Sequence, residues 1–395
     1  MKITAIKTFV CNAYRTNWVF VKVLTDVPGL YGVGEATLEY RELTVVQACQ
    51  ELERDLKGKD PRNIEAIWHD NYRDAYFRGG PVLMSAISAI DMALWDIQGK
   101  ELGVPAYRLL GGAVRDRVPC YANGWYVGSK TPDDFAAHAA AAVQDGFKAL
   151  KWDPFGSAYR TLDAKQFCAA IECVAKVHEA VRGKADLIIE GHGRFDLPTA
   201  LRVAHALEDF GILWLEEPLI PDSLEALAEL KTRVRVPIAC GERLYSRWQF
   251  RTLMELRAAD YIQPDVSHAG GLTEMKKIAA MAETHYIPIC PHNPSGPVAN
   301  AATLQLAACL PSFYLLETMA GDVSWRKDVC KENVEITDGQ MHIPTASGLG
   351  VDICEEAIAN HPYKPTALRH YRGTLVDIRP ADAGKYYSSS APSDK

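Results

Sequence analysis

The 395-residue sequence has no apolar run of the length that a transmembrane helix needs. Its first residues, MKITAIKTFVC, alternate in the manner of a strand and lack the long apolar core and cleavage site of a signal peptide. The chain also has no excess of basic residues, since its net charge is −7. This charge argues against a nucleic-acid-binding surface. We therefore expect a cytoplasmic protein that binds neither a membrane nor nucleic acid.

Two motifs of reactive sites are absent as well. None of the ten cysteines belongs to a CxxC pair, so we expect reduced cysteines that mostly fill the core. The sequence contains no G-x-S-x-G, which leaves an acyl-transfer hydrolase without support. What remains has the balance of a globular protein, with 48% hydrophobic and 24% charged residues.

The pattern of apolar residues divides the chain into three parts. Residues 1–35 alternate as strands and residues 43–110 carry apolar positions at helical spacing, so the first 120 residues predict an α+β unit. From about residue 118, short apolar runs alternate with helical stretches. This alternation stops after Met319, where VEITDGQMHIPTASGLGVDI predicts a hairpin and a glycine-rich turn. We expect that segment to pack on the N-terminal unit and the polar tail SSSAPSDK to be disordered.

A charged or polar residue ends each apolar run in the middle part of the chain. From Glu190 onward, successive run ends are 23 to 27 residues apart. A repeat of this length predicts one strand and one helix per unit, and seven or eight units predict an α/β fold with a parallel (β/α)8-type barrel. A doubly wound open sheet is the alternative, although its site residues cluster at one switch point. The run ends are Lys151, Glu190, Glu216, Glu242, Asp265, His292 and Glu317.

Three of these run ends, Glu190, Glu216 and Glu242, predict a metal site. The active site of such a barrel lies at the carboxyl ends of its strands, so these side chains should converge. One glutamate alone would more often be solvated or cap the next helix. Three carboxylates packed together repel one another unless a cation lies between them. Because hard oxygen ligands with open positions suit Mg²⁺, we expect one Mg²⁺ per subunit.

The remaining run ends predict acid–base groups. His292 follows Asp265 by one strand–helix unit, and a carboxylate beside an imidazole fixes its tautomer and raises its basicity. Lys151 ends an apolar strand, which makes it a second candidate acid or base, or a clamp for a substrate carboxylate. Glu190 and His192 stand two residues apart, so their side chains could share one face of the sheet.

Longer motifs carry a resemblance that spans nearly the whole chain. They are GVGEA (32–36), FRGGPVLMSAISAIDMALWDIQGK (77–100), LLGG (109–112), WLEEP, CGE, IQPDVSHAGGLTE and PHNPSGP. With them the sequence resembles the enolase superfamily, in its mandelate racemase-like subgroup. The resemblance implies a modified TIM barrel at residues 121–320 and an α+β capping domain at residues 1–120. Residues 321–395 would complete the capping domain.

The resemblance also implies roles for individual residues. Glu190, Glu216 and Glu242 would hold the metal, His292 with Asp265 would be the base, and Glu317 would hydrogen-bond the substrate carboxylate or the enolate. The segment EGHGRF resembles the DFHGR pattern of galactonate dehydratase-type enzymes, with Glu in place of Asp. His192 would then protonate the departing 3-hydroxyl. Racemases of the family carry a second lysine where this chain has Asp153, which disfavours a two-base racemase.

The implied reaction is Mg²⁺-dependent removal of the C2 proton of a sugar acid, followed by loss of the 3-hydroxyl to give a 2-keto-3-deoxy acid. An epimerase, racemase or cycloisomerase working through Lys151 or Asp153 is the alternative, and the intact ligand set disfavours a non-enzymatic barrel. We expect a small-molecule acid sugar as substrate and a homo-oligomer. Substrate contacts are expected from residues 12–18 and Arg41 of the capping domain and from Asp153, Arg194, Asn123, Trp125 and Trp325.

Overall fold

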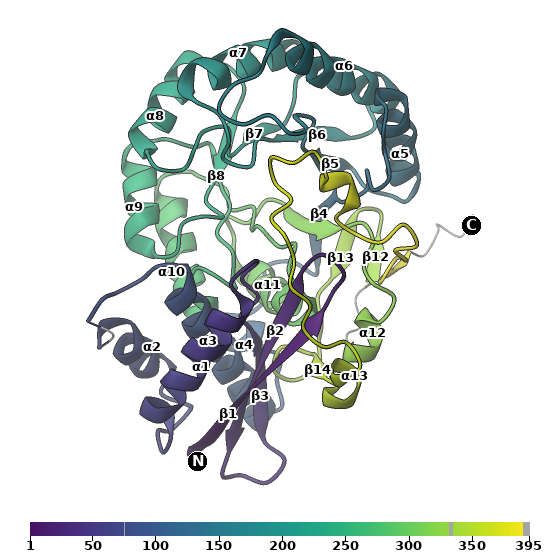
Figure 1. Cartoon of the computed structure of the whole chain (residues 1–395). Helices are drawn as coiled ribbons and strands as arrows, with labels where there is room; N and C mark the ends of the chain where they lie inside the picture. The colour runs from purple at the N-terminus through teal and green to yellow at the C-terminus, as the bar shows by residue number, and fades with distance from the viewer. Residues whose placement is uncertain (75, 332–334, 390–395) are drawn as a thin grey trace.

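The computed structural model describes residues 1–74, 76–331 and 335–389, which form a barrel with a smaller N-terminal unit against it (Figure 1). Most of the tail that we expect to be disordered, residues 390–395, lies outside the described residues. None of the helices described combines the length and apolarity that crossing a membrane requires.

The N-terminal unit, called the cap below, is an antiparallel three-stranded meander with helices packed on one face. Its last strand lies unusually close to the long helix α3. A Cβ atom on Gly32 or Gly34 would come within 1.9 Å of the carbonyl oxygen of Ala93 or Ala89, so only glycine fits at these two positions. The elements are β1 (Ile3–Asn12), β2 (Asn17–Thr25), β3 (Tyr31–Glu35), α1 (Glu42–Leu56), α2 (Ile64–Arg73), α3 (Pro81–Leu102) and α4 (Ala106–Leu109).

The larger unit is a closed parallel barrel, which confirms the predicted α/β fold. Strands β4 to β9 pair in sequence order, and β10 pairs with β4. The seventh position of the ring is a single residue, Ile289, whose parallel bridges to Ile262 and Phe313 join β9 to the start of the last strand. The strands are β4 (Arg117–Asn123), β5 (Ala149–Trp152), β6 (Asp186–Glu190), β7 (Trp214–Glu216), β8 (Ile238–Cys240), β9 (Tyr261–Ile262) and β10 (Leu316–Met319).

Helices cover the outside of the barrel between successive strands (Figure 1). After β10 the pattern changes, because α12 spans only Arg326–Val329 and the chain turns back toward the cap. The modification of the barrel therefore lies in its last unit. The outer helices are α5 (Pro132–Gln144), α6 (Ala164–Val181), α7 (Leu197–Leu207), α8 (Leu224–Arg233), α9 (Arg247–Glu255), α10 (Gly271–Thr284) and α11 (Pro297–Cys309).

The interior of the barrel is polar at the carboxyl ends of its strands and apolar in the layer next to these ends. One buried cluster collects side chains from neighbouring strands: Tyr121, Ala149, Ile188, Trp214, Ala239 and Cys290. Because alternate residues of a strand face the same side, the residues two positions further along point into the same interior. From Ala149, Ile188 and Trp214 this step leads to Lys151, Glu190 and Glu216. Strand periodicity therefore places these charged side chains in the layer next to the apolar cluster, at the carboxyl ends of the strands.

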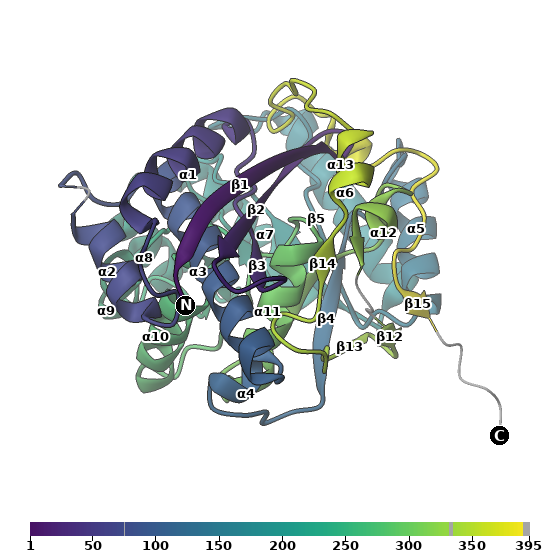
Figure 2. The ribbon, with the colours of Figure 1, turned by 90° about the horizontal axis from the view of Figure 1, so that it is seen from below.

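The C-terminal segment contacts both units. The predicted hairpin is present as β12 (Glu335–Thr337) and β13 (Gln340–His342), and β13 pairs antiparallel with β4 of the barrel. Further along, α13 (Glu355–Ala359) packs beside β1 of the cap (Figure 2). Packing on the cap therefore describes only part of this segment. Its remaining elements are β11 (Cys330–Lys331), β14 (Asp352–Ile353), the 3-10 helix η2 (Leu375–Asp377) and β15 (Ser388–Ser389).

Two buried carboxylates of the cap anchor it to barrel helices. Glu35, at the end of β3, accepts hydrogen bonds from the backbone N–H groups of Gly296, Val298 and Ala299 at 2.6, 3.1 and 2.9 Å. It thereby satisfies the first turn of α11, whose N–H groups have no partner within the helix. Asp91 of α3 accepts from the backbone N–H of Thr273 in α10 at 3.0 Å.

Asp91 should make the stability of the fold depend on pH. Burial raises its pKa to about 7, so the folded protein binds a proton that the unfolded chain releases near pH 4. Its contribution is therefore largest below pH 4 and is lost as the pH rises toward 7, by at most about 1.4 kcal/mol per pH unit. Asp91→Asn should flatten this part of the profile in urea unfolding at pH 5 and pH 8. The exposed Asp116→Asn is the control, and equal slopes for both variants and wild type would contradict the assignment.

Candidate active site

The carboxyl ends of the barrel strands open into a cavity of about 440 Å³. Its walls come from three parts of the chain: the barrel, the cap loops after β1 and β3, and the C-terminal segment, which crosses between barrel and cap (Figure 1). The barrel supplies Asn123, Lys151, His192, Glu242, Arg243, Tyr245, His268, His292, Pro294 and Ser295. The cap supplies Thr16, Thr37, Leu38, Glu39 and Tyr40, and the C-terminal segment supplies Leu368, Arg369, His370, Tyr371 and Ile378.

A buried ammonium group lies among carboxylates on the cavity floor. The Lys151 Nζ atom is 2.6 Å from Glu216 Oε1, 2.8 Å from Glu317 Oε1 and 3.2 Å from Glu190 Oε2. Although burial lowers the pKa of Lys151, Glu216 and Glu317 raise it well above its ordinary value. Lys151 is therefore held as a cation, which suits the predicted clamp for a carboxylate and argues against its acting as a base.

The three glutamates predicted as metal ligands converge. Each of Glu190, Glu216 and Glu242 offers a carboxylate oxygen within 4.8 Å of the others. Glu190 and Glu216 are paired across adjacent strands, and Glu242 follows the end of the next strand. Apart from its ion pair with Lys151 at 3.2 Å, the buried Glu190 Oε2 atom has no hydrogen-bond partner among the described residues, so it retains capacity for a cation. This all-oxygen donor set fits a hard divalent cation such as Mg²⁺.

His292 and Asp265 form a hydrogen-bonded pair on the cavity wall. His292 Nδ1 lies 2.7 Å from Asp265 Oδ2, and its Nε2 lies 3.5 Å from Glu242 Oε2. Burial lowers the pKa of His292, but Glu242 and Asp265 outweigh it and raise the pKa to about 10. The imidazole thus has one nitrogen fixed by Asp265 and the other directed toward the predicted metal ligands. This geometry orients Nε2 for proton transfer in the cavity.

A second pair of the same kind involves His192. Its Nδ1 lies 2.7 Å from Asp153 Oδ2, and the same carboxylate oxygen forms an ion pair with the buried guanidinium of Arg194. Burial raises the pKa of Asp153, but Arg194 and His192 lower it overall, so the carboxylate stays charged. β6 and the bridge at Ile289 stand third and seventh in the eight-position ring, so the two histidine–aspartate pairs come from opposite sides of the barrel.

The backbone of His192 is held in an uncommon conformation. Its φ angle is 52°, a left-handed value that costs a non-glycine residue free energy. Three hydrogen bonds offset this cost. The His192 N–H donates to Glu190 Oε1 at 2.7 Å, while its carbonyl accepts from the Tyr371 hydroxyl at 2.7 Å and from Arg243 at 3.3 Å. The turn after β6 thus aims the imidazole into the cavity.

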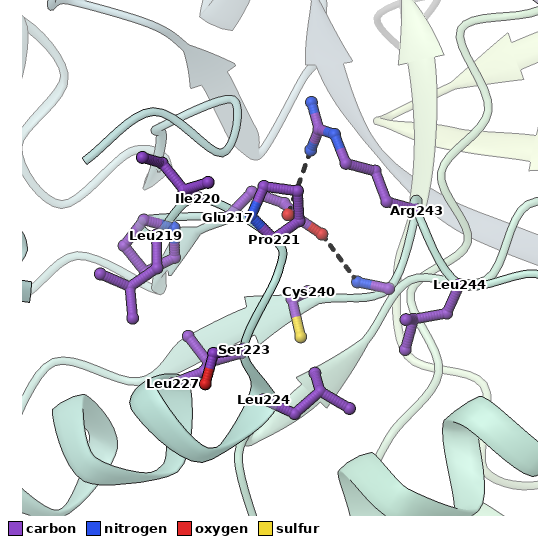
Figure 3. Close-up of a pocket in the computed structure, with 12 residues that line it drawn as sticks. Glu217, Leu219, Ile220, Pro221, Ser223, Leu224, Leu227, Cys240, Arg243 and Leu244 are labelled. Carbon is purple, nitrogen blue, oxygen red and sulfur yellow. Dashed lines mark hydrogen bonds and ion pairs between the residues drawn. The ribbon is translucent and has the colours of Figure 1, made fainter. Parts of the chain in front are cut away.

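Arg243 links this cavity to a smaller one behind it. Its guanidinium lies 2.8 Å from Glu242 Oε1. It also lies 3.1 Å from Glu217 Oε2, and Glu217 accepts from the Gly241 N–H at 3.1 Å (Figure 3). The smaller cavity, about 30 Å³, is lined mainly by leucines and other apolar side chains from the loops after β7 and β8. Because it lacks room for a substrate, we assign it a packing role and regard Arg243 as a fixed positive charge beside Glu242.

The structure divides the predicted substrate contacts into two groups. Asn123 lines the cavity, and Thr16 does so from the 12–18 loop. Asp153 is buried behind His192. Arg194 is fully buried and donates to the carbonyls of Gly191, Gly156 and Ala158, so it positions this loop instead of meeting a ligand.

Two tryptophans and Arg41 also lie outside the cavity lining. Trp125 donates to the Lys151 carbonyl at 3.0 Å, while Trp325 donates to the Asn12 carbonyl at 2.9 Å and stacks on His361. Arg41 is exposed and donates to the Tyr40 carbonyl. The substrate contacts expected from these side chains stay predictions, since none of the three residues is among those that line the cavity.

Several cavity residues escaped sequence reasoning. His268, three residues after Asp265, lies 2.9 Å from Ser85 Oγ through its Nδ1, and the motif DVSHAGG could have pointed to it. Glu39 and Tyr40 follow the GVGEA motif and could have been considered with it. Arg369, His370 and Tyr371 come from a segment without a repeat or strand pattern. No local signal places them beside the barrel, because only the tertiary path of the chain does so.

Comparison with known proteins agrees with this architecture. Residues 2–111 match the model of the mandelate racemase/muconate lactonizing enzyme N-terminal domain, and residues 134–357 match the enolase C-terminal domain-like model. The chain belongs to this family of the enolase superfamily. The resemblance inferred from the motifs is thus confirmed.

Individual relatives cover most of the chain. A D-galactonate dehydratase of Pectobacterium atrosepticum is 39% identical over 91% of this chain and 94% of its own length. A D-gluconate dehydratase of Thermoproteus tenax is 36% identical over 89% of this chain and 71% of its own length. The crystal structure of a mandelate racemase/muconate lactonizing enzyme from Sulfitobacter superposes with a TM-score of 0.88, at 30% identity over 93% of this chain and 97% of that one.

Replacing the buried lysine should expose the repulsion between the glutamates. In Lys151→Met, carboxylates face one another without the ammonium, so we expect the free energy of unfolding in EDTA to fall by about 3–5 kcal/mol. Mg²⁺ should then raise the melting temperature of the variant more than that of wild type. The control is Lys148→Met, whose lysine forms only a surface ion pair with Asp338. Scanning fluorimetry measures these melting temperatures. An equal rise with Mg²⁺ in the variant and in wild type would contradict this account.

Proposed function

We propose that the protein is a sugar-acid dehydratase that removes water from an aldonate of the galactonate or gluconate type. The observation that carries the proposal is the presence of two histidine–aspartate pairs on opposite sides of one cavity, next to three convergent glutamates. Dehydration of a 2,3-dihydroxy acid needs a base for the C2 proton and an acid for the 3-hydroxyl. The names of the dehydratase relatives support the same reaction.

The cavity floor binds the reacting end of the substrate in this proposal. Lys151 pairs with the C1 carboxylate, and Glu317 positions Lys151. Glu317 is itself fixed by Asn123 at 2.8 Å and by the Asn293 N–H at 3.0 Å. Mg²⁺ held by Glu190, Glu216 and Glu242 would neutralise these carboxylates, lower the pKa of His292 and stabilise negative charge on the substrate oxygens.

His292 takes the C2 proton through Nε2, while Asp265 holds Nδ1 and stabilises the imidazolium that forms. The resulting enediolate expels the 3-hydroxyl, to which His192 delivers a proton, so that water leaves. The enol product tautomerises to a 2-keto-3-deoxy sugar acid. Asp153 and Arg194 position His192 and do not touch the reacting atoms.

The alternative outcomes from the same enolate have weaker support. An epimerase or cycloisomerase would need another proton path, and Lys151 and Asp153 are the groups considered for it. Lys151 is held as an ammonium group and Asp153 is paired with both Arg194 and His192, so neither is a free base. Assembly into a homo-oligomer and a cytoplasmic location stay predictions from the sequence.

The assignment of the base is tested by His292→Asn. With the metal site intact but no base, we expect both dehydration of D-galactonate or D-gluconate and exchange of the C2 proton in D₂O to fall about 10²–10⁴-fold. Proton NMR follows both processes in one sample. His285→Asn, a change at the exposed end of α10, is the control. Exchange at the wild-type rate in His292→Asn would place the base elsewhere.

The role of the acid is tested by His192→Asn, which separates proton removal from water loss. We expect dehydration to fall about 10²–10⁴-fold, whereas C2 exchange continues because His292 remains. A substrate analogue with fluoride at C3 should be consumed at nearly the wild-type rate, since fluoride needs less protonation to leave. Unchanged dehydration by a folded His192→Asn protein would remove His192 from the mechanism and favour the cycloisomerase.

A further inference from the structure

We propose that Glu39 and Arg369 form a recognition site for the terminal hydroxyl of the substrate, and that this pair selects monocarboxylic over dicarboxylic sugar acids. The inference rests on the proposed function, because it takes the substrate to be a sugar acid whose C1 carboxylate lies at the strand ends. Neither residue belongs to the barrel. Glu39 comes from the cap loop after β3, and Arg369 from the C-terminal segment.

Arg369 is a largely buried cation on the cavity wall. Its side chain is 6% exposed, and the residue lines the cavity. One terminal nitrogen donates to the Arg15 carbonyl, and the other lies 3.5 Å from Glu39 Oε1. The Nε–H group has no hydrogen-bond partner within the described part of the chain. That nitrogen is shielded from solvent, so we assign contact with a ligand to the terminal nitrogen that lies beside the partly exposed Glu39 carboxylate.

Glu39 is an anion with room for a ligand. Its side chain is 38% exposed, and within the described residues its carboxylate makes only the ion pair with Arg369. Burial raises its pKa, but the positive charges of Arg369, His370 and Arg379 lower it overall. Glu39 therefore offers acceptor oxygens to the cavity, and no donor.

A hydroxyl group matches this pair and a carboxylate does not. A hydroxyl accepts from the terminal Arg369 nitrogen beside Glu39 and donates to a Glu39 oxygen, so it can bind both groups at once. A second carboxylate could accept from Arg369 but would stand beside the ionised Glu39 without a proton to share. The second carboxylate of the ligand and the Glu39 carboxylate would repel each other, because the positive charge of Arg369 is already balanced by Glu39.

The position of the pair suits the far end of a substrate. The proposed binding site for the C1 carboxylate lies on the floor, at the strand ends. It consists of Lys151 and the glutamates that would hold the metal ion. Glu39 and Arg369 come from the two segments that line the cavity from outside the barrel, the cap loop after β3 and the C-terminal segment. A chain of hydroxylated carbons bound by its acid group on the floor would present its terminal hydroxyl to these two segments.

Binding measurements on the full chain in Mg²⁺ buffer test the proposal. The His292→Asn background allows ligands to bind without turnover. By isothermal titration calorimetry we expect D-galactonate to bind at least about tenfold more tightly than galactarate, which differs by carrying a carboxylate at the far end. Adding Glu39→Gln should reduce this preference at least about fivefold, because the repulsion disappears. Glu51→Gln, an exposed change on α1 of the same cap, is the matched control and should leave the preference unchanged.

Arg369→Lys provides a second variant that keeps the positive charge and loses the planar set of guanidinium N–H donors. It should weaken galactonate binding about tenfold, as expected for a charge-assisted hydrogen bond. Equal binding of both acids, or a preference that Glu39→Gln leaves at the Glu51→Gln value, would overturn the proposal. A preference for galactonate without any dehydration by wild type would reject the proposed function and keep the recognition site. If the protein binds both acids equally and dehydrates both, the recognition site is rejected and the proposed function is kept.

Discussion

Repulsion between like charges in a buried place is the constraint on which the site depends. Glu190, Glu216 and Glu317 are buried at strand ends above the apolar cluster of the barrel, and Glu242 beside them is only 11% exposed, so water screens these charges weakly. Lys151 and Arg243 provide the compensating charge from within the chain. The fold thus preorganises the carboxylate oxygens that would bind a metal ion. The reaction that we propose depends on this preorganised charge distribution.

The two histidines differ because their aspartates have different partners. Asp153 is shared between His192 and the permanently charged Arg194, whereas Asp265 faces His292 and, at 3.9 Å, His268. Glu242 adds negative charge on the His292 side. The same residue pair can therefore serve as an acid in one place and a base in the other, because environment and not residue type sets the role.

The sequence predicted the barrel and its polar floor well, because both depend on local periodicity. The 26-residue steps between Glu190, Glu216 and Glu242 follow directly from one strand and one helix per unit. The positions of Arg194 and Trp325 outside the cavity lining were not foreseen, since a side chain near a strand end can turn under the loop as easily as into the cavity. Arg369 and His370 were out of reach, because their place depends on a long path without regular structure.

Glu35 is anchored in the first turn of α11, and this contact separates substitutions that change substrate fit from substitutions that change the proton-transfer groups. The carboxylate fixes the base of the cap loop to the helix that follows His292, and Thr37 hydrogen-bonds it at 2.6 Å. Beyond that point, residues 38–40 line the cavity and include none of the groups assigned to proton transfer or metal binding. Substitutions there can alter which acid fits while the proton-transfer groups stay in register. Such a division lets a lineage drift between substrates through few steps, with little penalty for the enzyme's ancestral reaction.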